Sequence, residues 1–70
     1  MSMVEVFGTL EKSVQSNGQR KLVWRIPALT ASIATQRAKF NTRFKGINNF
    51  TVDQAEKVDD RRYNVSIVAN

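Results

Sequence analysis

The absence of both cysteine and histidine constrains this chain most, because it removes the common ways of stabilising a very small fold. The 70 residues suffice for one small domain over 1–70 with a thin apolar core. Chains of this size often gain stability from disulfides, a structural metal or self-association. Without cysteine or histidine, disulfides and structural zinc are not available. We therefore expect well-ordered packing, self-association as a homodimer, or both.

The composition is typical of an ordered globular protein. Apolar residues make up 41% and charged residues 24% of the chain, which is close to average usage. No apolar run approaches the length that a membrane-spanning helix needs, and the first residues lack the pattern of a signal peptide. We expect no membrane association and a cytoplasmic location, or the infected cell or virion if the source is viral or a mobile element.

Alternation of apolar and polar residues predicts two strands in the first part of the chain. In residues 3–14 one side carries four aliphatic residues: Val4, Val6, Leu10 and Val14. Phe7 interrupts this pattern, so a β-bulge is expected at Phe7-Gly8. In residues 21–26 one face carries Leu22, Trp24 and Ile26. Pro27 ends this second run because proline cannot donate a ladder hydrogen bond.

The turn between these strands determines which side chains share a face, because a one-residue change of register moves every side chain to the opposite face. A two-residue Asn17-Gly18 loop is the common choice, but it would separate the two apolar sets. A three-residue loop over 16–18, with Gly18 as the left-handed residue, pairs Leu10 with Trp24. We predict the three-residue loop, since it unites the apolar side chains on one face.

The pattern over residues 30–45 predicts a helix. Thr30 or Ser32 can cap its N-terminus, and Gly46 suits the position just after its C-terminus. An apolar stripe at helical spacing is expected to pack in the core, and it comprises Leu29, Ile33, Phe40 and Phe44. Arg37 flanks this stripe, so its stem is expected to pack while its guanidinium reaches water.

Alternation returns after Gly46 and predicts a terminal hairpin from residues 50–58 and 63–69. A two-residue turn at Asp59-Asp60 would pair Val58 with Arg61, Val52 with Ile67 and Phe50 with Ala69. Asp-Asp is a poorer turn than Asp-Gly, so a longer loop stays open as an alternative. The whole pattern predicts an α+β fold in the order β-β-α-β-β, with a small antiparallel sheet and one helix packed on one face.

Charge is unevenly distributed along the chain. The formal net charge is +5, from 11 basic and 6 acidic residues. Between residues 12 and 52 there are basic residues and no acidic one, whereas four acidic residues fall between 53 and 60. This segregation indicates an anionic partner, with a solvated, positively biased surface as the alternative.

Catalysis is not expected from these residues. The acidic group comprises Asp53, Glu56, Asp59 and Asp60. Its spacing matches neither a calcium loop nor a converging pair of catalytic carboxylates, so we interpret it as a solvated hairpin paired with Arg61 and Arg62. Serine and threonine lack a histidine base, and no glycine-rich phosphate loop is present. We expect no catalytic residue, no metal and no cofactor.

The basic residues are the best candidates for a binding site. The set proposed to contact nucleic-acid phosphates or an acidic partner comprises Arg20, Lys21, Arg25, Lys39, Arg43, Lys45 and Arg62. Lys21 and Arg25 are expected on the helix-free face of the sheet, and Phe7 is expected to point to the same face. Phe7 and Tyr63 are candidates for stacking on bases.

Two functions stay open at this point. A nucleic-acid-binding module would place these cations on phosphates. A protein-binding module, such as a regulator, an inhibitor or an assembly protein, would set them against an acidic protein or add an edge strand to another sheet. One contiguous basic stripe would favour nucleic acid, and scattered cations would favour a protein partner.

One stretch resembles a known family. The run from Val23 to Pro27, a helix that ends near Gly46, and the run from Phe50 to Val52 are similar to small phycobilisome linker domains. The similarity covers about thirty residues and requires an insertion before the helix, and Lys45 stands where that family has the second glycine of its usual pair. Such linkers are basic and wedge between acidic proteins, so the resemblance implies an assembly role on an acidic protein partner.

Overall fold

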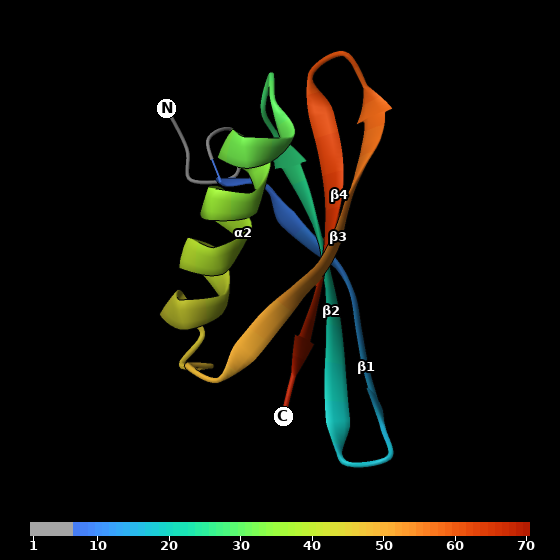
Figure 1. The fold of residues 1–70 in the computed structure, drawn as a ribbon, viewed down its shortest axis with the longest axis vertical. Coiled ribbons are helices and arrows are strands. Elements are labelled where there is room, and N and C mark those ends of the chain that lie inside the picture. Colours follow the sequence, from blue (N-terminus) through green and yellow to red (C-terminus); the bar gives the residue numbers. More distant parts are fainter. Residues whose placement is uncertain (1–6) are drawn as a thin grey trace.

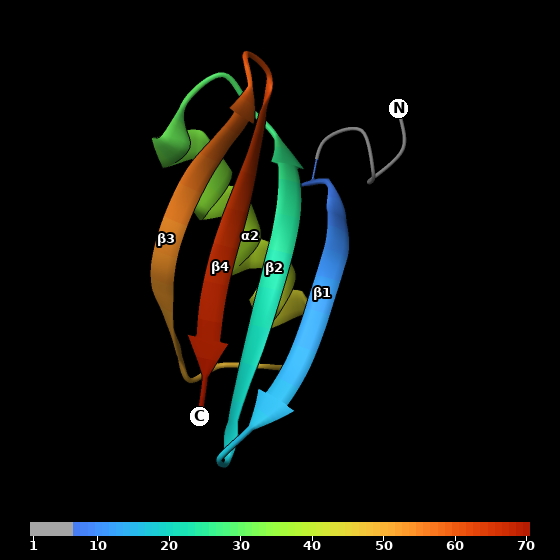
Figure 2. The ribbon, with the colours of Figure 1, turned by 90° about the vertical axis from the view of Figure 1, so that its right-hand side faces the viewer.

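The computed structural model describes residues 7–70, which form one antiparallel sheet with a helix across one face (Figure 1). The elements are β1 (Thr9–Ser16), β2 (Gln19–Pro27), α2 (Ala31–Phe44), β3 (Phe50–Asp59) and β4 (Arg62–Ala69). The strand order is β1-β2-β4-β3, so the last strand lies in the middle of the sheet (Figure 2). The expected β-β-α-β-β order is confirmed, and among the elements of residues 7–70 one helix packs on the sheet, as predicted. The predicted strand positions Val4 and Val6 lie outside the described residues.

The core lies between α2 and the two central strands. From β2 it takes the predicted set Leu22, Trp24 and Ile26, and from β4 it takes Tyr63, Val65, Ile67 and Ala69. Helix α2 lies over β2, β4 and β3, whereas β1 is the edge strand that it leaves uncovered (Figure 2). Most of β1 is therefore exposed on both faces.

The turn of the first hairpin differs from the predicted three-residue loop. Ser16 pairs with Gln19, so the loop is the two-residue Asn17-Gly18 turn. Both residues have positive φ, 53° and 78°, which is the requirement of a type I′ turn. The prediction was wrong about the loop because the chain corrects its register elsewhere.

That correction is a β-bulge at Glu11, between the pairs formed by Leu10 and Lys12. Leu10 still lies opposite Trp24, as predicted, and faces the helix. Beyond the bulge the side chains change faces, because one extra residue inverts the alternation. Val14 therefore lies on the helix-free face and is 46% exposed, instead of sharing the face of Leu10.

The terminal hairpin turns one residue later than predicted. Asp59 pairs with Arg62, so the two turn residues are Asp60 and Arg61, and the predicted pair of Val58 with Arg61 does not form. Two irregularities in β3, one between Val52 and Gln54 and one between Lys57 and Asp59, absorb the difference. The predicted pairs of Val52 with Ile67 and Phe50 with Ala69 are confirmed.

Both ends of α2 carry the predicted caps. Thr30 is the N-cap, and its side-chain oxygen accepts a hydrogen bond from the Ile33 amide at 3.2 Å. At the other end Gly46 has φ 91° and donates its amide to the Arg43 carbonyl at 2.9 Å. The Ile47 amide reaches the Thr42 carbonyl at 3.2 Å, which completes a Schellman motif.

The helix buries a different face from the one predicted. Its buried residues are Ala34, Ala38, Asn41 and Thr42. The stripe expected in the core is instead exposed, at 72% for Leu29, 41% for Ile33, 45% for Phe40 and 78% for Phe44. The large side chains of the sheet already fill the space under the helix, so only a helix face of small side chains packs closely against it.

Three polar contacts attach α2 to the rest of the chain. The Trp24 indole Nε1 donates to Thr42 Oγ1 at 3.1 Å, and this hydroxyl donates to the Ala38 carbonyl at 2.8 Å. The Asn41 side-chain amide donates to the Phe7 carbonyl at 2.7 Å. Arg37 Nη1 donates to the Pro27 carbonyl at 2.6 Å, so the half-buried guanidinium, predicted to reach water, also has a backbone partner.

Replacing Gly8 with alanine is expected to destabilise the protein by more than about 2 kcal/mol. Gly8 has φ +83°, and an added Cβ would lie 2.0 Å from the Arg25 carbonyl oxygen. The control is Gly18→Ala. Gly18 also has a positive φ, +78°, but a Cβ added there meets nothing within 4 Å. This variant should therefore lose only about 1 kcal/mol of stability, the cost of the left-handed conformation for alanine. Urea unfolding measures both variants, and equal losses would contradict this account of Gly8.

Thr42→Val is expected to lower the free energy of unfolding by about 1–3 kcal/mol, because it leaves the buried Trp24 N–H without an acceptor. Valine matches threonine in shape, so the loss reports the hydroxyl and not a cavity. Thr42→Ser keeps the hydroxyl and should be the more stable of the two variants in the same urea titration. A valine variant as stable as the parent chain would show that the hydrogen bond contributes nothing.

Candidate interaction surfaces

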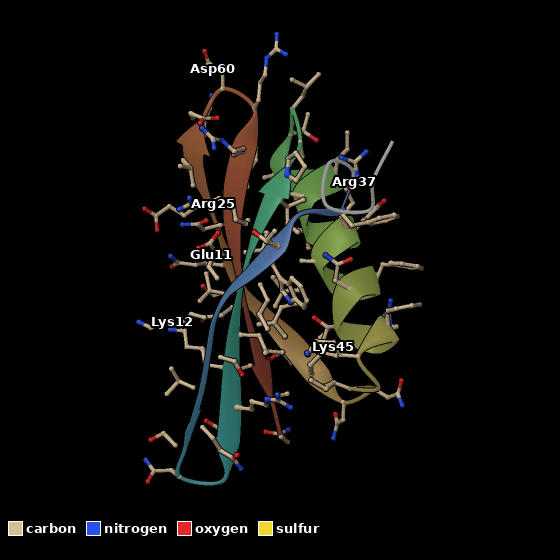
Figure 3. All side chains as sticks on the ribbon, turned by 180° about the vertical axis from the view of Figure 1, so that it is seen from behind. Glu11, Lys12, Arg25, Arg37, Lys45 and Asp60 are labelled. Carbon is tan, nitrogen blue, oxygen red and sulfur yellow. The ribbon has the colours of Figure 1, made fainter. Side chains whose placement is uncertain are left out.

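The helix-free face of the sheet is the side opposite α2, and it carries several of the predicted binding residues. The pairing of β2 with β4 places Lys21, Val23 and Arg25 on this face, because Leu22 and Trp24 face the helix. Lys12 joins them from β1, where it lies opposite Val23. Figure 3 shows Lys12 and Arg25 extending away from the side of the sheet that α2 covers.

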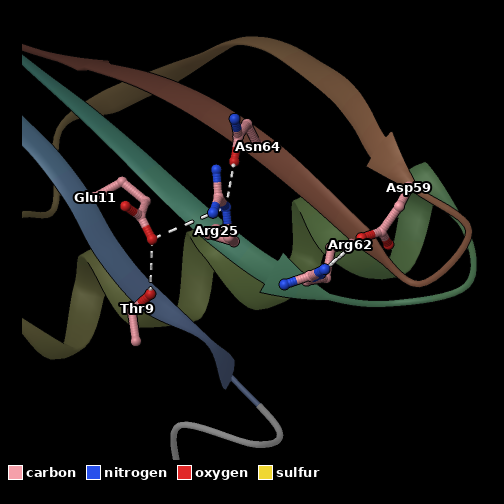
Figure 4. Close-up of polar contacts among 6 residues, drawn as sticks. All are labelled: Thr9, Glu11, Arg25, Asp59, Arg62 and Asn64. Atoms are coloured by element: carbon pink, nitrogen blue, oxygen red, sulfur yellow. Dashed lines mark hydrogen bonds and ion pairs between the residues drawn. The ribbon is translucent and has the colours of Figure 1, made fainter.

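Two predicted cations on the helix-free face are occupied by acidic side chains (Figure 4). The Arg25 Nε atom lies 3.9 Å from Glu11 Oε1 and donates to the Asn64 side-chain oxygen at 3.3 Å. An Arg62 Nη atom lies 2.6 Å from Asp59 Oδ2, and its Nε donates to the same oxygen at 2.8 Å. Sequence reasoning expected Arg62 to pair within the acidic hairpin, but it missed Glu11, which the bulge places beside Arg25.

The remaining cations lie on different sides of the molecule. Arg20 is on the helix side of β2, opposite Gln15 and Ala69, and donates to Ser13 Oγ at 3.3 Å. Lys39 and Arg43 belong to α2, and Lys45 is its C-cap. The Arg43 guanidinium lies over the Phe50 ring at 5.4 Å from its centroid. The seven predicted residues therefore do not form one stripe on one face.

Neither predicted stacking residue lies on the helix-free face. Phe7 stacks on Phe40 of the helix, with ring centroids 4.9 Å apart. Tyr63 is a core residue that is only 9% exposed. Among residues 7–70 every aromatic side chain lies in the core or on the helix side. Base stacking on the helix-free face is thus not available to them.

An exposed apolar ridge is made of Ile33, Phe40 and Phe44 on α2 and of Leu29, which lies just before the N-cap of the helix. The Phe40 and Phe44 rings are 6.2 Å apart, and Phe7 extends the stack from the other side. Sequence reasoning recognised these residues as a stripe but assigned them to the core. Alanines at 34 and 38 together with Thr42 are the sequence feature that marks the face the helix does bury.

A depression on the helix-free face lies close to the turn of the first hairpin. It has a volume of about 420 Å³. Its lining comprises Lys12, Val14, Ser16, Asn17, Gln19, Lys21, Val23, Ser66 and Val68. Lys12 was not among the predicted site residues, although its place in the acid-free stretch was a sequence signal for it.

Comparison with known proteins gives no relative from which a function could be inferred. No protein-family model, no curated protein and no solved structure matches this chain. The described part of the chain contains no helix long and apolar enough to span a membrane. In residues 7–70 no three acidic side chains gather as metal ligands would.

The contacts of Asp59 predict its titration. Its pKa lies below the usual value of 3.8, mainly because the Arg62 side chain donates to it and also because the Arg61 amide does so. A lowered pKa means that the pair stabilises the fold above this usual value and that the contribution is lost as pH falls through the folded-state pKa.

We expect an NMR titration to give Asp59 a pKa below 3.8 and Arg62→Gln to raise it towards that value. Arg61→Gln is the control, because the contact of Arg61 with Asp59 uses its backbone amide. An unchanged Asp59 pKa in the Arg62 variant would contradict the assigned cause.

Proposed function

We propose that this chain is a non-catalytic protein-binding module whose apolar ridge on α2 docks an acidic amphipathic helix of a partner protein. The observation that carries the proposal is the exposure of large apolar side chains along one helix, which reaches 78% at Phe44. Soluble proteins rarely leave such side chains contiguous in water unless another surface covers them.

The spacing along the ridge favours a helix as the occupant. Ile33, Arg37, Phe40 and Phe44 follow intervals of four, three and four residues. This is the repeat by which one helix presents a seam to another. Arg37 is held at this seam by its contact with the Pro27 carbonyl, so its stem contributes apolar surface.

Charge around the ridge favours an acidic partner over a second copy of this chain. Helix α2 and its C-cap carry Arg37, Lys39, Arg43 and Lys45 and no acidic residue. Two copies packed ridge to ridge would bring these cations together, and like charges at an interface are unfavourable. A helix with acidic flanks would instead complement them.

The arrangement of cations also favours this proposal over a basic stripe for nucleic acid. The seven predicted residues are divided between both sides of the sheet, and Arg25 and Arg62 are already paired with carboxylates. The cations of α2 and its C-cap, which lie beside the ridge, are suited to the polar rim of a protein interface.

A designed helical peptide tests the proposal, with leucine at the a and d positions and glutamate at the e and g positions. Fluorescence anisotropy of the labelled peptide measures binding. We expect Phe44→Ala to weaken binding by about tenfold or more, as loss of an exposed aromatic anchor does. Unfolding should change by less than about 0.5 kcal/mol, because this side chain is mostly exposed.

Two controls make the experiment specific. Val58→Ala removes another exposed apolar side chain, 42% exposed, from β3, away from the ridge, and should leave binding unchanged. A peptide with lysine in place of glutamate should bind much more weakly. Equal binding of both peptides, or tight binding of anionic vesicles through Phe44 with no peptide binding, would overturn the proposal.

A further inference from the structure

The depression on the helix-free face is a second candidate site, separated from the apolar ridge by the thickness of the sheet. Its lining residues come from β1, β2 and β4 and from the turn of the first hairpin. These three strands are neighbours in the sheet (Figure 2). Its position depends on the bulge at Glu11, which turns Lys12 and Val14 towards this face. The ridge proposed for a partner helix contributes no residue to it.

Two lysines give this depression its charge. Lys12 lies opposite Val23, and Lys21 lies opposite Val14, so the two lysines are diagonal neighbours across β1 and β2. Diagonal positions in an antiparallel pair are about 7–8 Å apart. In the described part of the chain neither ammonium group lies within 4.0 Å of a carboxylate.

The acidic residues of this face lie outside the depression. Glu11 is beside Arg25, and Asp59 is bound by Arg62. Glu56, opposite Asn64, accepts a hydrogen bond from the Gln54 side chain at 3.4 Å. The lining of the depression contains no acidic residue. Its polar side chains, including Ser66 and Gln19, can donate further hydrogen bonds. The site therefore selects for an anion.

The apolar floor of the depression indicates which class of anion it can bind. Val14, Val23 and Val68 give it an apolar surface between the lysines. A small, strongly hydrated anion gains nothing from apolar contact, whereas a chain of phosphates joined by sugars presents apolar sugar faces between its charges. In a single strand the sugar faces are free to lie on such an apolar floor between two phosphates.

We propose that this depression binds the backbone of a single-stranded nucleic acid, with Lys12 and Lys21 on two phosphates and the valines against the sugar between them. The lining contains no aromatic residue on which a base can stack. Binding is therefore weak, insensitive to base sequence and dominated by the phosphate contacts. The protein would then hold a strand on one face and a partner helix on the other.

Binding of a labelled oligo-dT of about a dozen nucleotides to the full chain tests this site. Two phosphate contacts on a single strand predict a slope of about −1.4 in log K against log salt concentration. The double variant Lys12→Gln/Lys21→Gln should bring this slope close to zero and weaken binding about tenfold or more at low salt. Binding of oligo-dA and oligo-dT should be similar, since no base is read.

Matched controls separate this site from general positive charge. Lys57→Gln removes an exposed lysine that pairs with Asp60 on the terminal hairpin, and it should leave the slope unchanged. Phe44→Ala should also leave it unchanged, while the double lysine variant should retain binding of the acidic helical peptide. The two proposed surfaces can thus fail independently.

Three results would overturn the inference. The first is an equal loss of oligonucleotide binding in the Lys57 variant and the double lysine variant. The second is tighter binding of duplex than of single strand. The third is complete competition by inorganic phosphate at concentrations equal to those of oligonucleotide phosphate, which would make this a site for a free anion.

Discussion

The small side chains on the buried face of α2 determine how the rest of the molecule is arranged. Ala34 and Ala38 are fully buried, and the hydroxyl of Thr42 meets the indole of Trp24. This face brings the helix close to a sheet whose own side chains supply most of the core volume. No room is left for the larger residues of the helix, which therefore form the apolar ridge. The exposed surface of the domain is a direct result of how its core is filled.

The strand pairing shows which parts of a fold local sequence can predict. The need to place apolar side chains on one face predicted the pair of Leu10 with Trp24, which forms. It did not predict where the extra residue would be placed. Asn17 and Gly18 both adopt the positive φ of a two-residue turn, so the extra residue is not in the turn. It is Glu11, which forms a β-bulge within β1. A bulge at a polar edge residue has no distinctive sequence pattern, because its energetic reason is the pairing of the whole strand.

The candidate surfaces were predictable to a smaller extent. The acid-free stretch drew attention to Lys21, which lies on the helix-free face, but the pairing of Arg25 with Glu11 depends on a bulge that no local pattern indicates. The ridge was visible as a stripe, yet helical periodicity offered two faces, and hydrophobicity favoured the wrong one. Which helix face is buried depends on whether the large core side chains come from the sheet or from the helix. The side-chain volumes of the sheet and of the helix must fit each other, and the sequence of one segment does not show this.

The central position of β4 has a consequence for how the chain folds. Strands β2 and β3 do not touch each other, and both depend on β4 for their inner neighbour. Each hairpin forms from nearby residues, whereas joining them requires Ile26 to find Tyr63 across the length of the helix and β3. Non-local pairing of this kind slows folding, because chain entropy is lost before the contacts form. During synthesis β4 is made last, so the sheet cannot be completed until then. Before β4 pairs, the apolar faces of β2 and α2 are exposed and can bind chaperones or other chains.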